Sequence, residues 1–434
     1  MKNILKNIIT RILQWEAKLI LDKYHPKIIG VTGSVGKTST KDAIYRVLSK
    51  GGFSVRKSEK SYNSETGLPL TILGCQSAWN DPFGWLEIIL YGLRQLFSNK
   101  PYPKWLVLEV GLEYPGDIKN ILKWVKFDVA VTTLIPEVPV HMELFASKED
   151  VINEKMLLPK SVTSEGIVLL NADDLNALKF VPEIKADIFT YGQNDKADYR
   201  AGMGETYYEN KDGYDLPTGL EFTLYHSEKD LTVRIPGVVG NHQIYPVLSA
   251  LALGEKLGLN MVEMADSFSD YLPPAGRLCL LAGIKDTIIL DDTYNASPVA
   301  MSAGLTALES FHTKGRKIAV MGDMLQLGGM TVEAHKKIGY QAAEFCDLVI
   351  TVGLRSRFID DALVEKKFHR KRIKHFDDSV EAGKFLQSKL QPGDVIFVKG
   401  SQLTRMEKVV EEVMLHPELK DKLLVRQDKE WAKR

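Results

Sequence analysis

The sequence has few of the features that mark secreted, membrane-spanning or nucleic-acid-binding proteins. Its 434 residues include only three cysteines, which lie far apart and form no CxxC pair, so we expect neither a disulfide framework nor a cysteine metal site. Lysine plus arginine and aspartate plus glutamate both number 56, which leaves no basic surplus for a nucleic acid. No stretch reaches the roughly 18 apolar residues of a membrane-spanning helix, and no signal peptide pattern is present. We therefore predict a cytoplasmic protein with reduced thiols.

The composition is otherwise that of an ordinary globular protein, 44% hydrophobic and 26% charged, with a length that suits two to three domains. From Lys27 onward, short β-rich runs alternate with helical stretches, which indicates an α/β protein with a mostly parallel sheet. Within 198–236 we expect antiparallel edge strands. Pro273, Pro274 and Gly276 mark the predicted hinge before a second α/β series. The buried-strand candidates are Lys27–Thr32, Trp105–Glu109, Val129–Leu134, Gly166–Leu170, Ile188–Tyr191, Thr287–Leu290, Lys317–Met321, Leu348–Val352 and Val395–Val398.

Two apolar helical segments stand apart from this alternation, and each leaves two interpretations open. Residues 1–24 have apolar side chains at helical spacing among several lysines. Such a stripe usually packs on its own protein, which we favour, but a basic amphipathic helix also binds weakly to membrane surfaces. Residues 82–97 are predicted to form a core helix or a platform for helix 1–24. Alternatively, both helices cover a modified acceptor site or contact a membrane that carries a lipid-linked substrate.

A phosphate-binding loop is the strongest local signal. It follows a predicted strand and opens a predicted helix over residues 37–50, which is the context such a loop requires. The glycines let backbone N–H groups turn toward phosphate oxygens, and the helix N-terminus adds positive charge. Lys37 would reach the β- and γ-phosphates of ATP, and the Thr38 hydroxyl would bind Mg²⁺. The spacing is the short form GxxGK[ST], with the residues Gly33, Ser34, Val35, Gly36, Lys37, Thr38 and Ser39.

With this loop, a series of further blocks resembles the Mur ligases, the ATP-dependent amide ligases of peptidoglycan precursor synthesis. The blocks occur in the family's order between about residues 28 and 407. The resemblance implies a central P-loop ATPase-like domain over 25–272, a C-terminal Rossmann-like α/β domain over 273–434, and helix 1–24 before them. The blocks are Asn63–Pro69, Leu108–Gly111 with Pro115–Ile118, His141–Phe145 with Glu154 and Lys155, Asp291–Pro298, Gly322–Met324 with Leu327, Gly328 and His335, and Lys399–Ser401.

The resemblance implies a metal centre beside the loop with two Mg²⁺ sites. Glu109 ends a predicted strand, where doubly wound sheets place ligands, although a solvated strand-end acid fits the residue pattern equally well. His141 would bind the second Mg²⁺. Lys155 matches a family lysine that reacts with CO₂ to form a carbamate, which turns a cation into an anion able to bridge metal ions. Partial burial would help, because the reaction needs a neutral amine.

The same resemblance implies nucleotide contacts from the second half of the chain. Arg277 would contact a phosphate group of the nucleotide after the hinge closes. A guanidinium suits this role because its donors form a fixed, planar fork. Gln243 would contact adenine. The family usually has asparagine at this position and again three residues later, where this chain has Pro246, whose side chain cannot hydrogen-bond to a base. The remaining residues would face ribose and base, unless Asp291–Pro298 is a plain turn after a strand. They are Asp292, Tyr294 and Asn295, with Lys399 and Ser401 near the same cleft.

The implied activity is amide ligation through an acyl phosphate. The blocks most resemble family members that add D-alanyl-D-alanine to a UDP-N-acetylmuramoyl-tripeptide, which would make these the amine donor and the acceptor. Family members carry a UDP-binding domain before the loop, whereas here one helix stands in that place. We therefore keep open another carboxylate acceptor, such as an amino-acid polymer, and a partner protein that supplies the domain. A non-catalytic nucleotide-binding subunit is the remaining alternative.

Overall fold

The computed structural model describes residues 2–58, 62–136, 144–211, 214–227, 229–428 and 431. It divides into two compact units, each of which is described by itself. Unit 1 contains residues 1–202, 223–232 and 245–268, and unit 2 contains residues 203–222, 233–244 and 269–434. The predicted domain boundaries at residues 25 and 273 remain predictions. No helix of the described residues is both long and apolar enough to span a bilayer.

The first sheet confirms the expected parallel arrangement with an antiparallel edge. Its strand order is β10-β9-β7-β6-β5-β4-β1-β3-β2, and β8 pairs with β9. Strands β1 to β7 pair with their neighbours in parallel. Strand β9 is antiparallel to β7 and β8. The strands are β1 (Lys27–Thr32), β2 (Val55–Lys57), β3 (Trp105–Glu109), β4 (Val129–Thr132), β5 (Ile167–Asn171), β6 (Asp187–Gly192), β7 (Tyr199–Ala201), β8 (Glu205–Lys211), β9 (Tyr214–His226) and β10 (Lys229–Pro236).

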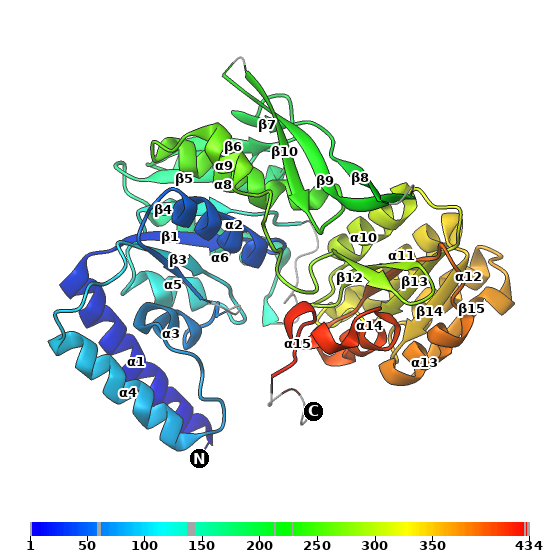
Figure 1. Cartoon of the computed structure of the whole chain (residues 1–434). Coiled ribbons are helices and arrows are strands. Elements are labelled where there is room, and N and C mark those ends of the chain that lie inside the picture. Colours follow the sequence, from blue (N-terminus) through cyan, green and yellow to red (C-terminus); the bar gives the residue numbers. More distant parts are fainter. Residues whose placement is uncertain are drawn as a thin grey trace. The chain divides into compact units, whose positions relative to one another are not determined.

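Helices connect these strands, as parallel strands require (Figure 1). Helix α2 leads from β1 toward β2, and α6 leads from β4 to β5. The helices are α1 (Lys2–Tyr24), α2 (Lys37–Lys50), α3 (Gly67–Leu73), α4 (Pro82–Phe97), α5 (Asp117–Leu122), α6 (Lys148–Ser161), α7 (Leu175–Leu178), α8 (Ile244–Lys256) and α9 (Met261–Asp266), with 3₁₀ turns at Val181–Glu183 and Asn241–Gln243.

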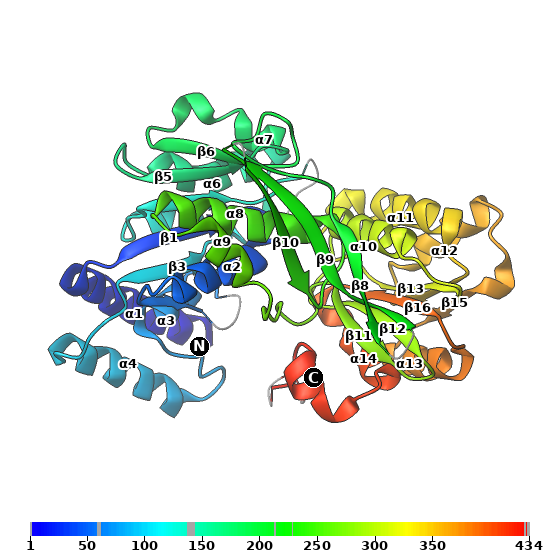
Figure 2. The ribbon, with the colours of Figure 1, turned by 45° about the horizontal axis from the view of Figure 1, so that its top comes forward.

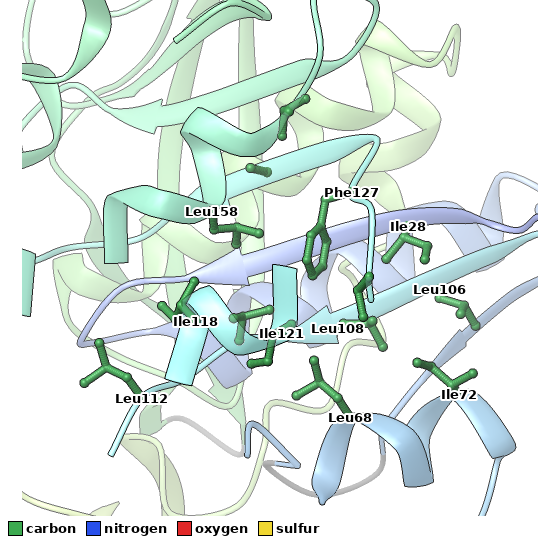
Figure 3. Close-up of a cluster of buried hydrophobic side chains, with 14 of the residues drawn as sticks. Ile28, Leu68, Ile72, Leu106, Leu108, Leu112, Ile118, Ile121, Phe127 and Leu158 are labelled. Carbon is green, nitrogen blue, oxygen red and sulfur yellow. The ribbon is translucent and has the colours of Figure 1, made fainter. Parts of the chain in front are cut away.

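One apolar cluster of unit 1 joins strands of the sheet to helices that include α3, α5 and α6. Five of the six residues of β1 are buried, which explains its continuous apolar sequence. A Cβ on Gly30 would lie 2.7 Å from Cδ1 of Phe127, so glycine is needed where this ring crosses the strand. Figure 3 shows the cluster that results, formed by Ile28, Leu68, Ile72, Leu106, Leu108, Leu112, Ile118, Ile121, Phe127 and Leu158.

Helix α1 packs on its own unit, as favoured from its sequence. It lies against α3 and α4, and Leu13, Ala17 and Ile20 are fully buried on this face. Figures 1 and 2 both show α1 and α4 side by side. The segment 82–97 therefore does form a platform for α1, as predicted. At their contact, Glu16 is fully buried, and a Cβ on Gly92 would lie only 2.4 Å from its Oε2.

Glu16→Gln is expected to stabilise the protein at pH 8 by about 2 kcal/mol, with little effect at pH 4.5. Burial raises the pKa of Glu16 to about 7, and its carboxylate has no hydrogen-bond partner among the described residues. Between its unfolded pKa of 4.5 and about 7, only the folded state holds this proton, so stability falls as pH rises through that window. Urea unfolding at both pH values measures the effect. The exposed Glu87→Gln is the control, and an equal gain at both pH values would contradict the prediction.

Unit 2 contains the second α/β series. Its sheet has the order β11-β12-β16-β13-β14-β15, parallel except for the antiparallel pair β11 and β12. Its elements are β11 (Cys279–Gly283), β12 (Thr287–Asp292), α10 (Pro298–Ser310), β13 (Lys317–Gly322), α11 (Thr331–Phe345), β14 (Leu348–Val352), α12 (Arg357–Glu365), β15 (Ile373–Phe376), α13 (Ser379–Lys389), β16 (Val395–Lys399), α14 (Glu407–Val413) and α15 (Lys420–Leu423), with 3₁₀ turns at Gly328–Met330, Arg370–Arg372, Gln402–Thr404 and Pro417–Leu419.

One expectation about local structure is corrected. The strand expected over Val129–Leu134 ends at Thr132, and Leu134 forms an isolated bridge with Val35. After α15, the guanidinium of Arg426 donates to the carbonyl oxygen of Thr293 within unit 2.

Candidate active site

The loop between β1 and α2 has a backbone that needs its two glycines. Gly33 has φ +129°, and a Cβ there would lie 2.0 Å from Oγ1 of Thr133. Gly36 has φ +89° and directly precedes the first residue of α2. No acidic residue occupies the first turn of α2, so the positive N-terminal end of this helix dipole is not neutralised locally. The local geometry is that of an anion-binding helix start.

The neighbouring strand holds this loop in place. The amides of Ser34 and Val35 donate to the carbonyl oxygen of Leu134, at 2.9 and 3.3 Å, just past the end of β4. The Ser34 hydroxyl is buried and has no hydrogen-bond partner among the described residues. A buried polar group without a hydrogen-bond partner costs free energy. This hydroxyl is therefore suited to form a hydrogen bond with a bound ligand.

Two lysines converge on the same backbone carbonyl of the loop. Nζ of Lys37 lies 3.0 Å from the Gly33 oxygen, and Nζ of Lys155 lies 2.9 Å from it. Lys155 lies on the buried face of α6, four residues after Val151 and three residues after Ile152, which are both buried. Burial and the positive charge of Lys37 hold the pKa of Lys155 well below its usual range. The structure therefore places a buried amine with increased neutral character beside the phosphate loop.

Glu109 stands next to the first turn of α2. It ends β3, whose parallel register with β1 pairs it with Val31. Its Oε2 accepts a hydrogen bond from the Thr38 hydroxyl at 3.1 Å, and its Oε1 accepts one from Nδ2 of Asn63 at 3.4 Å. The carboxylate belongs to a residue that is only 2% exposed. The alternative of a solvated strand-end acid is therefore wrong.

These oxygen donors fit one Mg²⁺ ion. Mg²⁺ prefers oxygen ligands and is commonly held by one or two protein groups together with phosphate oxygens and water. Thr38 and Glu109 supply such a pair. The described residues contain no group of three or more His, Cys, Asp or Glu side chains arranged to hold a metal by themselves. His141 lies outside the described residues, so its part in a second Mg²⁺ site remains a prediction.

A cavity of about 710 Å³ opens beside Asn63 within unit 1. Its walls come from α1, which contributes Thr10, Arg11 and Gln14, from residues 63–66, and from residues 111–124. Asn63 contacts both this cavity and Glu109, so the cavity reaches the region of the phosphate loop. Sequence reasoning placed Asn63 in a family block but gave it no role. Its position in a polar stretch of the sequence offered no local signal for the contact with Glu109.

Lys41 is a second residue that the sequence interpretation missed. It lies one turn after Lys37 in α2, is fully buried, and donates to the carbonyl oxygen of Ser58 at 2.8 Å. It also lies 3.4 Å from the carboxylate of Asp42. A lysine on the inward face of an amphipathic helix is the only sequence signal. The contact ties α2 to the chain that follows β2.

In unit 2, the predicted nucleotide-contacting residues are held by one another. Asp292 and Lys399 form a buried ion pair at 2.6 Å, and Nζ of Lys399 also donates to the carbonyl oxygen of Asn295 at 2.8 Å. The Arg277 guanidinium lies 3.9 Å from the centre of the Tyr294 ring. Nε2 of Gln243 donates to the backbone oxygen of Arg277 at 2.6 Å. The described contacts therefore bring these six predicted residues into one cluster within unit 2, and their nucleotide contacts remain predictions.

His335, from the same family blocks, has a structural role. Its Nε2 accepts from the amide of Met324 at 3.0 Å, and its Nδ1 lies 2.7 Å from the carbonyl oxygen of Thr331. Nδ1 must then carry the proton, which makes the ring neutral. Burial lowers the pKa of His335 and favours the same state.

Together, the fold and the loop define an α/β protein that binds the phosphates of a nucleotide. The model "Mur ligase middle domain" matches residues 31–83 and 90–254, and "Mur ligase, glutamate ligase domain" matches 276–402. The chain therefore belongs to the Mur ligase family, and it is an ATP-dependent ligase. The fold class expected from the sequence is confirmed.

Individual relatives agree with this assignment. The UDP-N-acetylmuramoyl-tripeptide–D-alanyl-D-alanine ligase of Bacillus subtilis is 29% identical over 407 residues, which cover 93% of this chain and 79% of that protein. The enzyme of the same name from Haemophilus influenzae is 26% identical over 412 residues, 92% of this chain and 80% of that protein. The solved MurF ligase of Thermotoga maritima in complex with ADP has a TM-score of 0.73 and 26% identity, covering 95% of this chain and 84% of that one.

Proposed function

We propose that this protein joins D-alanyl-D-alanine to the terminal carboxylate of a UDP-N-acetylmuramoyl-tripeptide-like acceptor, with conversion of ATP to ADP and phosphate. The observation that carries the proposal is the convergence of Lys37, Lys155, Thr38 and Glu109 around the Gly33 loop. The names of the B. subtilis and H. influenzae relatives support this choice of substrates.

The phosphate loop and the start of α2 bind the ATP phosphates in this mechanism. Lys37 leaves the Gly33 carbonyl and places its charge on the β- and γ-phosphates. The acceptor carboxylate attacks the γ-phosphorus, the bond to ADP breaks, and an acyl phosphate forms. The donor amine then attacks the acyl carbon, loses a proton, and phosphate leaves. Thr38 and Glu109 would hold Mg²⁺, which supplies neutralisation of phosphate charge.

Lys155 is proposed to act as a carbamate. The neutral amine nitrogen adds to the carbon of CO₂ and releases one proton, so an uncharged side chain becomes an anion. Starting from the ammonium form, two protons are released in all, and the charge changes from positive to negative. A neutral amine is required, and burial beside Lys37 favours that form. The anion would compensate the charge of Lys37 and add oxygen ligands near Thr38 and Glu109. A second Mg²⁺ held by this carbamate and His141 belongs to the same proposal.

The cavity beside Asn63 is the proposed acceptor site. It is large enough for part of a peptide-bearing substrate and is lined by both acidic and basic side chains. Arg11 and Lys123 offer cations to acceptor carboxylates, and Glu65 and Glu113 offer anions to an acceptor ammonium group. A different carboxylate acceptor would use the same cavity.

Phosphate release from ATP, read together with product mass, tests this function. With UDP-N-acetylmuramoyl-tripeptide and D-alanyl-D-alanine both present, we expect phosphate release and a product with the summed mass of the two substrates less one water. Omitting either substrate should reduce release to background. ATP binding without coupled product would reject these substrates and favour another carboxylate acceptor. Absence of turnover with any acceptor would favour a non-catalytic nucleotide-binding subunit.

A further inference from the structure

The outer face of α4 exposes large apolar side chains in a single stripe. Phe83 and Phe97 are 79% and 87% exposed, and Leu86 and Leu90 lie between them at 54% and 42%. Their spacing of three, four and seven residues puts all four on one side of the helix. The opposite side of α4 packs on α1 through Gly92. Large contiguous apolar surfaces are rare on soluble monomers. They mark sites that bind a protein, a membrane or a ligand.

Helix α1 has exposed apolar side chains of its own. Ile8 and Trp15 are each about half exposed, one above the other at a spacing of seven residues. Glu16 and Lys23 mark the side of α1 that faces α4, because they contact Gly92 and the Leu96 carbonyl oxygen. At 3.6 residues per turn, Ile8 and Trp15 lie on the flank that borders this side. The two helices lie side by side in Figures 1 and 2, and the exposed apolar side chains of both are together called the α1–α4 face.

The two helices and their flanking residues carry an excess of positive charge, although the chain as a whole has no net charge. Residues 2–24 and 79–104 contain eight lysines and arginines against four acidic residues, and one of those acids, Glu16, is buried. The acidic residues are Glu16, Asp22, Asp81 and Glu87. The basic residues are Lys2, Lys6, Arg11, Lys18, Lys23, Arg94, Lys100 and Lys104.

We propose that this α1–α4 face docks on the surface of a bilayer that contains anionic lipids. Amphipathic helices with aromatic and leucine side chains on one face and basic residues beside them lie in the interface plane of such membranes. Basic residues near the surface add attraction to anionic headgroups. A second copy of the chain fits less well, since it would bring two regions of excess positive charge together. Docking does not depend on the proposed function, because its test needs neither ATP nor acceptor.

Sedimentation of the full chain with vesicles tests the proposal. We expect binding to phosphatidylcholine vesicles with 30–40% phosphatidylglycerol, at least about tenfold weaker binding to pure phosphatidylcholine, and weakening by 0.5 M salt. The double variant F83S/F97S should bind at least about tenfold more weakly. The matched control L175S/L354S removes two equally exposed apolar residues elsewhere and should bind like the parent.

Circular dichroism and thermal unfolding establish that each variant is folded. K100E/K104E tests charge separately and should weaken binding to the anionic vesicles only. Equal binding by F83S/F97S and the parent would overturn the proposal, as would no binding to either vesicle. Sedimentation equilibrium is run in parallel. A dimer that F83S/F97S dissociates, without vesicle binding, would assign the face to a second copy instead.

Discussion

Lys37→Ala is expected to lower ATP turnover by at least about 10³-fold while the protein stays folded. The Lys37 amine is the charge that the loop brings to the phosphates, and its present partners are the Gly33 and Ser34 carbonyl oxygens. Removing it leaves the negative charge of the transferring phosphoryl group without its closest cation. Phosphate release under saturating substrates measures the loss.

Two comparisons make this result specific. Lys126→Ala removes an exposed lysine of the same unit and should turn over like the parent. Thermal unfolding of Lys37→Ala should stay within a few degrees of the parent, because the hydrogen bonds from its amine to the Gly33 and Ser34 carbonyl oxygens lie within the loop. Turnover within threefold of the parent would mean that the loop does not serve catalysis. It would favour the non-catalytic subunit.

Lys155→Met is expected to lose turnover by about 10²- to 10³-fold without losing thermal stability. Methionine fills a similar space and carries no charge, so it removes the burial cost of the ammonium form. The lowered pKa of Lys155 means that the unfolded state binds this proton more readily, and stability rises with pH up to about 10.5. The variant should lose that pH dependence, and it should unfold at an equal or higher temperature at pH 7.

A second pair of measurements separates a carbamate from a plain lysine. Parent protein equilibrated with ¹³C-bicarbonate should give a carbamate carbon signal that Lys155→Met lacks. Lys155→Ala leaves space for a small anion, so formate or acetate at high concentration should restore part of its turnover, whereas chloride should not. Full activity of the parent in CO₂-free buffer, with no carbamate signal, would reject the modification and leave Lys155 as a charge-positioning residue.

The local parts of this site were predictable because they depend on short sequence patterns. The strand Lys27–Thr32, the glycines of the loop and the helix from Lys37 all occur as expected. Gly33 and Gly36 occupy backbone angles that other residues adopt only with strain, so their positions in the sequence already require a turn. Likewise, continuous apolar runs identified the buried parallel strands of both sheets.

The contacts between distant segments were not predictable from the same patterns. Nothing in the sequence around Arg426 indicated that its guanidinium donates to the carbonyl oxygens of Thr293 and Tyr294. Similarly, nothing near Asp292 in the sequence indicated that Lys399 neutralises it. Such pairs lie more than 100 residues apart, so only the folded chain decides them.

The sequence by itself determined the fold class, the phosphate loop and the family, because these rest on periodicity, glycine geometry and blocks of residues read in order. The tertiary structure alone decided that Lys155 is buried against the Gly33 carbonyl oxygen, and that Glu109 is shielded beside Thr38. It also decided that Glu16 lies unpaired under α4 while the phenylalanines of α4 face solvent. The physical reason is that burial, and with it pKa and the reach of a charge, depends on which distant elements pack together.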